Sequence, residues 1–407
     1  MTAQSGMARI ALVIGLLGAV GPFAIDMYLP ALPEVAADLG ASAQATQLTL
    51  TAYFLAFGVS QLVYGPAADQ YGRKPPLYVG LAIFLLGTFG CVVAPSIEAL
   101  IAARLVQGLG AATVMVVPRA IIRDLYSGPA ATRLMAMVML VISVSPMLAP
   151  LAGSGLMLVG SWRLIFAVLG VAALVSLALT AFVLPETLAA GKRTPARPAV
   201  LLRGFWRLLR DPAFMGLTLI GGFSMSSFFV FLASASFVYT GQFGLSPTGF
   251  SLAFALNAIG FFAASQTAAS LGERFGMARV VGTAVTAFAA VTTLLLLVAL
   301  AGYATLPVII AMLFVGNAFL GVVMPTTMVM ALDPHPDIAG LASSLGGTLQ
   351  MVTGGVMMAL AGPFFDGTAT PMVAAIAVAG LLACATAALT FRGDRRLRRS
   401  AGAGADP

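Results

Sequence analysis

The chain has 407 residues, of which 60% are hydrophobic and 9% are charged, and its formal net charge is +7. Soluble domains carry roughly 25% charged residues, so this composition excludes an ordinary soluble protein, and its hydrophobicity excludes an intrinsically disordered one. Two cysteines and one histidine exclude a disulfide framework or a Cys-rich metal site and leave little material for histidine-based catalysis. The composition predicts a polytopic membrane protein without a cofactor or a metal.

Long stretches without charge mark the predicted membrane spans. A helix needs about 20 apolar residues to cross a bilayer, and the stretches 212–272 and 280–332 fit two crossings each, because turn residues interrupt them. We expect an all-α membrane protein with twelve transmembrane helices and no outer-membrane barrel. In chain order the predicted helices are Ile10–Leu29, Thr46–Ala67, Leu77–Ala94, Ile97–Ile122, Leu134–Val159, Trp162–Leu184, Phe214–Val238, Thr248–Ala269, Val280–Ala301, Leu306–Ala331, Ile338–Gly362 and Met372–Phe391.

The basic residues predict the orientation of these helices. Lys and Arg are enriched in cytoplasmic loops. With both termini in the cytoplasm, nineteen of the 21 basic residues fall in cytoplasmic segments, and the exceptions are Arg104 and Arg163. We therefore predict a multi-pass protein of the bacterial inner (cytoplasmic) membrane with both termini cytoplasmic. The positive charge is read as topogenic, so the expected partner is the lipid bilayer and not nucleic acid.

Two loops half a chain apart resemble each other. Asp69-Gln70-Tyr71-Gly72 and Glu273-Arg274-Phe275-Gly276 share an acid, a polar residue, an aromatic ring and a glycine, at an offset of 204 residues. A parallel duplication predicts two six-helix bundles with substrate bound between them near the bilayer midplane. The expected units are an N-terminal six-helix bundle at 1–184, a cytoplasmic linker at 185–212, a C-terminal six-helix bundle at 213–392 and a basic cytoplasmic tail at 393–407.

Four segments resemble a known family. Gly65–Lys74 is similar to the loop signature between helices 2 and 3 of the major facilitator superfamily. Asp26–Pro33 resembles its drug/proton antiporters of the Bcr/CflA type, which export bicyclomycin and chloramphenicol-like compounds. Arg104–Ala112 and Ser145–Gly153 resemble the helix 4 and helix 5 signatures of the same group. The resemblance covers nearly the whole chain and implies the major facilitator fold.

Asp26 is the main candidate for proton and substrate coupling. A carboxylate at the centre of a membrane helix costs roughly 2.5–3.5 kcal/mol on insertion scales, so it needs a partner or a function. The helical rise places Asp26 and Arg104 at a similar depth. The resemblance implies that helices 1 and 4 line the central cavity, so the two residues could form a switchable ion pair. The alternatives are that Asp26 meets interfacial water at a helix end and that Arg104 extends to the headgroups.

The loop after the second predicted helix is a candidate cytoplasmic gate. Its glycines allow close backbone approach and a tight turn, and its acid can bind a basic partner. The resemblance implies that this loop holds the two halves together on the inner side in the outward-open state, with Arg123 as the partner of Asp69. Simple topogenic charge is the alternative. The predicted gate residues are Gly65, Asp69, Gly72, Arg73, Lys74 and Arg123.

Further candidates lie within the predicted spans. Pro146 and Pro150 share one helical face, and each removes a backbone hydrogen bond. The resemblance assigns them, with Ala149 and Gly153, to a helix 5 antiporter motif, and an ordinary kinked helix is the alternative. Polar side chains within spans either line the cavity or form interhelical hydrogen bonds. The cavity candidates are Tyr28, Gln61, Tyr64, Gln107, Asn257 and Asn317.

These residues favour a transporter over an enzyme. The resemblance implies a secondary active multidrug efflux transporter that exports small hydrophobic antibiotics in exchange for protons by alternating access. A proton-coupled transporter of an endogenous metabolite is the alternative. An integral-membrane enzyme would need a catalytic or metal-binding cluster, and we expect His335 to be a solvated loop residue. The expected partners are a small drug, protons and lipid, and the protein is expected to be a monomer.

The predicted topology can be tested with fusions to the C-terminus. Because the basic residues favour one orientation, a C-terminal green fluorescent protein should fluoresce, and a C-terminal alkaline phosphatase should be inactive. The opposite pattern would place the C-terminus in the periplasm and contradict both the orientation and the duplicated bundles.

Overall fold

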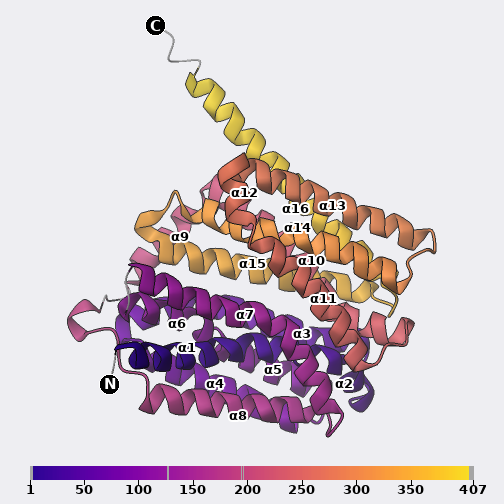
Figure 1. Cartoon of the computed structure of the whole chain (residues 1–407), viewed down its shortest axis with the longest axis horizontal. Coiled ribbons are helices and arrows are strands. Elements are labelled where there is room, and N and C mark those ends of the chain that lie inside the picture. The colour runs from indigo at the N-terminus through magenta and orange to yellow at the C-terminus, as the bar shows by residue number, and fades with distance from the viewer. Residues whose placement is uncertain (1–2, 126–127, 194, 196, 403–407) are drawn as a thin grey trace.

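The computed structural model describes residues 3–125, 128–193, 195 and 197–402 of the chain, and the part it describes contains helices and turns but no strand. Helices of the first half lie together in the lower part of Figure 1. They are α1 (Ala3–Asp26), η1 (Leu29–Ala31), α2 (Leu32–Asp38), α3 (Ala43–Tyr71), α4 (Lys74–Val93), α5 (Ile97–Ala111), α6 (Thr113–Leu125), α7 (Gly128–Met157) and α8 (Arg163–Phe182).

Helices of the second half form the upper part of the same view. They are α9 (Pro198–Leu209), α10 (Pro212–Phe237), the π-helical turn η3 (Val238–Gln242), α11 (Pro247–Ser265), α12 (Ala268–Phe275), α13 (Met277–Leu300), α14 (Leu306–Leu332), η4 (Pro336–Ile338), α15 (Ala339–Ala361) and α16 (Ala369–Gly402). The turn between α3 and α4, with Arg73 and Lys74, and the linker helix α9 lie at one end of the molecule, on the left of Figure 1. This end is called the basic end below, and the opposite end the far end.

The helices agree with a membrane protein. Eleven helical segments of the described residues are long and apolar enough to cross a bilayer, and the chain is therefore a multi-pass membrane protein. Each coincides with a helix predicted from the charge-free stretches. The remaining predicted helix, Leu134–Val159, coincides with α7, so the count of twelve spans stays a prediction.

The first span differs from its prediction because its helix stops at Asp26. The predicted helix Ile10–Leu29 is divided, and the candidate span continues through η1 and α2 to Asp38. Proline lacks an N–H and disfavours helical backbone in the residue before it, and Pro30 and Pro33 follow the break. The break leaves the Met27 carbonyl free to be approached closely by another helix.

Helix α7 approaches α1 at this break. Gly153 packs so tightly on the Met27 carbonyl that a Cβ atom at Gly153 would overlap the carbonyl oxygen. On its other side α7 contacts α11, where the Ser251 hydroxyl donates a hydrogen bond of 2.9 Å to the Pro150 carbonyl. Pro150 has no N–H of its own, and Ala149 beside it is fully buried. Helix α7 thus connects the break in α1 with the second half of the chain.

The contact at Gly153 predicts a stability difference between two neighbouring glycines. Gly153→Ala should lower the melting temperature of the purified protein, because overpacking costs about 1–3 kcal/mol while alanine gains only ~1 kcal/mol over glycine in a helix. Gly155→Ala is the matched control, because nothing lies within 4 Å of a Cβ atom there. Equal melting temperatures of the two variants would contradict the packing of α7 on Met27.

Candidate functional site: a cavity between the two halves

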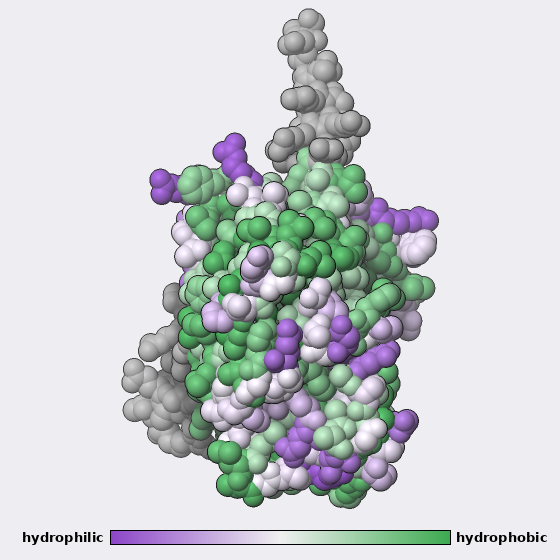
Figure 2. All heavy atoms as spheres, turned by 90° about the vertical axis from the view of Figure 1, so that its right-hand side faces the viewer, coloured by the Kyte–Doolittle hydropathy of each residue, from purple (hydrophilic) through white to green (hydrophobic). Residues whose placement is uncertain are grey.

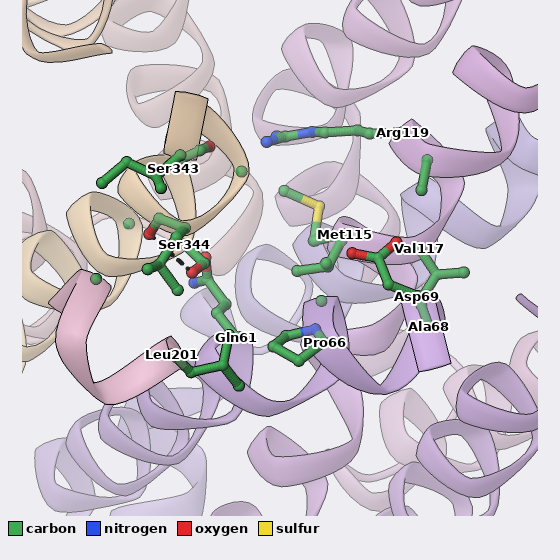
Figure 3. A pocket seen from close by; sticks show the side chains of 18 of the residues that line it. Gln61, Pro66, Ala68, Asp69, Met115, Val117, Arg119, Leu201, Ser343 and Ser344 are labelled. Atoms are coloured by element: carbon green, nitrogen blue, oxygen red, sulfur yellow. Dashed lines mark hydrogen bonds between the residues drawn. The ribbon is translucent and has the colours of Figure 1, made fainter. Parts of the chain in front are cut away.

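A cavity of about 1030 Å³ lies between the two halves of the chain. Helices α3 and α6 form one wall, α14 and α15 form the other, and α9 borders it at the basic end (Figure 3). Arg197 and Val200 of the linker are among its lining residues, so the cavity extends to the basic end. Other residues around it include Gln61, Pro66, Asp69, Met115, Arg119, Met324, Ser343, Ser344 and Met351.

The far end is closed by contacts between the halves. The Gln47 side chain of α3 donates a hydrogen bond of 3.3 Å to the Ser234 hydroxyl of α10. The rings of Phe54 and Phe229 stack with their centroids 4.0 Å apart. Figure 2 shows the face at this end, on which hydrophilic residues lie across the middle and toward the bottom, between apolar ones. The cavity is therefore accessible from the basic end in this conformation.

Small residues bring α3 and α15 together on the far-end side of the cavity. A Cβ atom at Gly58 would lie 2.8 Å from the Met351 side chain, and the Thr348 hydroxyl donates a hydrogen bond of 2.7 Å to the Gly58 carbonyl. A Cβ atom at Gly355 would lie 2.8 Å from the Leu55 side chain. Such small residues allow close helix packing in membranes, and here they close the cavity toward the far end.

The predicted gate motif forms an ion cluster around Arg73. This side chain is buried and binds Asp69 at 2.6 Å and Asp124 at 2.7 Å. The backbone N–H groups of Arg73 and Lys74 donate hydrogen bonds to the Glu186 carboxylate at 2.9 and 3.1 Å. The cluster lies within the first half of the chain. Sequence reasoning missed both Asp124 and Glu186. The signal for Glu186 was an acid placed four residues after α8 (Arg163–Phe182).

Binding of Glu186 to the turn between α3 and α4 explains the glycine at position 72. Burial of Glu186 opposes ionisation, but N–H groups from Arg73, Leu188 and Lys74 outweigh it and hold the pKa below its usual range. Gly72 has φ +97°, which favours glycine, and a Cβ atom there would lie 2.6 Å from a Glu186 oxygen. Gly72 therefore leaves the space that the Glu186 carboxylate occupies.

The expected partner of Asp69, Arg123, lines the same cavity without binding it. Among the described residues, the ion pair of Asp69 is the one with Arg73. Gly65 also lines the cavity. The pairing of Asp69 with Arg123 was implied for the outward-open state, so it stays a prediction.

Arg104 is fully buried, and the alternative that it extends to the headgroups is wrong. Its Nη1 atom donates hydrogen bonds to the Ala24 carbonyl at 3.1 Å and the Gln107 side chain at 2.5 Å. The guanidinium carbon lies 4.3 Å from the Tyr53 ring centroid and 5.0 Å from that of Tyr28. Its Nε and Nη2 atoms are buried without a hydrogen-bond partner. Arg104 therefore has two unused donors.

Asp26 lies at the C-terminal end of α1 and is 5% exposed. The described residues form no ion pair between Asp26 and Arg104, and none of them donates a hydrogen bond to the Asp26 carboxyl group in this conformation. The helix-end alternative is therefore right about the position of Asp26 in its helix, but burial separates the residue from interfacial water. The switchable pair stays a prediction.

The six cavity candidates divide between the cavity and the helix contacts. Gln61 lines the cavity. Gln107 binds Arg104 and the Thr88 hydroxyl, and the Tyr28 hydroxyl lies 3.1 Å from that of Thr49. Asn257 of α11 and Asn317 of α14 join their helices through a hydrogen bond of 3.2 Å. Tyr64 is buried and does not line the cavity.

The structure corrects the expectation for His335 and adds Arg119 to the site. His335 is 5% exposed, and its Nε2 atom lies 2.9 Å from the Asp211 carboxylate, because the loop after α14 folds back on the start of α10. Arg119 had been counted among the topogenic charges, but it lines the cavity. The signal for Arg119 was a charge six residues before the end of a membrane helix.

Comparisons with known proteins agree with the cavity and the helices. The family described as Major Facilitator Superfamily matches residues 14–244. The uncharacterized MFS-type transporter YdgK of Bacillus subtilis (strain 168) is 34% identical over 93% of this chain and 94% of its own. The bicyclomycin resistance protein homolog of Haemophilus influenzae is 31% identical over 92% and 94%. Multidrug resistance protein D of Escherichia coli (strain K12) is 32% identical over 86% and 88%.

Solved structures show the same fold. The D-xylose-proton symporter superposes with a TM-score of 0.74 over 94% of this chain and 97% of its own, at 16% identity. The human organic anion transporter MFSD10 superposes with a TM-score of 0.69 over 94% and 99%, at 19% identity. The match to the family and the resistance proteins among its relatives confirm the resemblance seen in the motifs: the chain belongs to the major facilitator superfamily, among transporters of the Bcr/CflA type.

Proposed function

We propose that this protein is a secondary active multidrug exporter that exchanges small hydrophobic compounds for protons by alternating access. The observation that carries the proposal is the cavity between the halves, which extends to the basic end while the far end is closed. Relatives named for bicyclomycin and multidrug resistance support the choice of drugs as substrates.

The proposal includes a topology. We place both termini and the basic end in the cytoplasm, so the conformation described above faces inward. We count α7 as the twelfth span, because it packs between α1 and α11. The two bundles are then 1–184 and 213–392, joined by the linker 185–212 and followed by the tail 393–407.

The walls of the cavity suit hydrophobic substrates of different shapes. Four methionines line it, and the flexible thioether side chain adapts to irregular apolar surfaces. Gln61, Gln350 and two serines supply hydrogen-bonding groups between them. The methionines are Met115, Met324, Met328 and Met351. A wall of this kind would bind compounds by apolar contact and orient them by few polar contacts.

Coupling is proposed to depend on Asp26 and the unused donors of Arg104. A buried ionised carboxylate without a partner is costly, so we assign the neutral acid to this conformation. Release of the proton to the cytoplasm would leave a carboxylate that the free Nε and Nη2 groups of Arg104 can bind. Helix α7, which contacts Met27 beside Asp26 and Ser251 of α11, would carry this change to the other half.

The proton gradient supplies enough free energy for this exchange. One pH unit corresponds to about 1.4 kcal/mol per proton, and 100 mV of membrane potential adds roughly 2.3 kcal/mol per charge. A tenfold drug gradient requires about 1.4 kcal/mol. One proton per neutral drug molecule is therefore sufficient.

Removal of the Asp26 carboxyl group should abolish coupling. In proteoliposomes with an imposed pH gradient, Asp26→Asn should reduce drug efflux to the level of empty liposomes, because no proton can be bound and released. Purified Asp26→Asn should also release no protons when drug is added. Asp366→Asn is the matched control, since Asp366 lies in a far-end loop bound to Thr368 and should leave efflux unchanged. Normal coupled efflux by Asp26→Asn would place the proton site elsewhere.

The two related loop glycines give a test of the gate. Gly72 and Gly276 have φ +97° and +84° with extended ψ, a backbone region populated almost only by glycine, so alanine is strained by about 1–3 kcal/mol at both. Only at Gly72 would the new Cβ atom also displace the Glu186 carboxylate. We expect Gly72→Ala to slow transport far more than Gly276→Ala while drug binding to the purified protein is retained. Loss of binding with normal conformational exchange would show that the loop acts on the substrate and not on the gate.

A further inference from the structure

Each acid that lines the cavity binds an arginine. Asp69 and Asp124 both bind Arg73, at 2.6 and 2.7 Å. Asp337 binds Arg207 of the linker helix α9, also at 2.7 Å. Asp69 and Asp124 share Arg73, so this cluster keeps one negative charge, whereas Asp337 has Arg207 to itself.

Two arginines of α6 line the same cavity without such a partner. Arg119 and Arg123 lie four residues apart, on one face of the helix. Neither takes part in an ion pair or a side-chain hydrogen bond within the described part of the chain. The lining holds four arginines and three aspartates, and Arg207 pairs with one of the aspartates from outside the lining, so positive charge is in excess at the cavity.

The position of Arg119 differs from that of a topogenic arginine. It precedes the end of α6 by six residues, or ~9 Å along the helix. An arginine that serves only orientation extends toward the headgroups, whereas Figure 3 shows the Arg119 side chain reaching across the cavity toward Ser343 of α15. Met115 and Gln61 lie on the deeper side of this group in the same view. The guanidinium therefore faces the space that a substrate would occupy.

We propose that the cavity selects compounds with one anionic group on an apolar body, and that Arg119 binds the anionic group. The planar guanidinium matches carboxylate and sulfonate oxygens with paired hydrogen bonds. Met115 and the methionines of α14 and α15 would hold the apolar body. This inference rests on the proposed function, because it names the substrate class of the same cavity.

A pair of fluorescent probes tests the inference. 8-Anilinonaphthalene-1-sulfonate and N-phenyl-1-naphthylamine share one aromatic skeleton, and only the first carries a sulfonate. Saturable binding of each is measured on protein in nanodiscs, with empty nanodiscs subtracted. Arg119→Gln should weaken binding of the sulfonate about tenfold or more, as expected for a lost charge-assisted hydrogen bond, and should change binding of the neutral probe less than about twofold.

Two further variants keep the result interpretable. Arg119→Lys keeps the charge but loses the paired geometry, so it should bind the sulfonate with intermediate affinity and serves if the glutamine variant does not fold. Arg203→Gln removes the same charge from an exposed linker position outside the cavity lining and should bind both probes like the unmodified protein. Equal weakening of both probes, or no weakening of either, in the Arg119 variants would overturn the inference.

Transport of the same probes separates this inference from the proposed function. The neutral probe could be exported in exchange for protons while neither binding nor export of the sulfonate depends on Arg119. That result would support proton-coupled export and contradict anion selection. If binding of the sulfonate depends on Arg119 but neither probe moves under a pH gradient, anion recognition stands and proton-coupled export of these compounds falls.

Discussion

The close contact between α3 and α15 holds the two halves of the chain together beside the cavity. Gly58 has no side chain to keep Met351 away, and its carbonyl accepts the Thr348 hydroxyl at 2.7 Å. With the two helices joined at this level, the space between the halves can widen only toward the basic end. Together with the Gln47–Ser234 hydrogen bond and the Phe54–Phe229 stack, this contact keeps the far end closed and leaves the cavity open toward the basic end.

The membrane spans could be predicted from the sequence because hydrocarbon excludes charge along the chain itself. A charge-free run long enough to cross the bilayer has few alternatives. The break after Asp26 was missed although Pro30 and Pro33 mark it, because membrane helices tolerate proline when neighbours satisfy the freed backbone groups. The helix of the linker was also missed, since its three turns are too short to be seen as a span.

The site could be predicted only in part, because its chemistry depends on which residues meet across the fold. The loop motif identified Asp69 and Arg73 as gate residues but gave Arg123 as the partner of Asp69, and the other members of the observed cluster, Asp124 and Glu186, lie 51 and 113 positions from Arg73. His335 was read as solvated because its local sequence is polar, and its partner lies 124 positions away. Local patterns identified the acids and bases, and the fold decided their partners.

The ion pairs of the described residues have a common feature. Those of Arg73 and Arg163 lie within the first half of the chain, and those of Arg207 and His335 join the linker helix and the α10 start to the loop before α15. None of them joins a helix before residue 184 to a helix after residue 212; these helices touch instead through hydroxyls, an amide, glycines and aromatic rings. In the proposed alternating access, each half would therefore move with its charges still paired, and α9 would move with the second half. Neutral contacts are little affected by counterions, so the contacts that close the far end should be nearly independent of ionic strength.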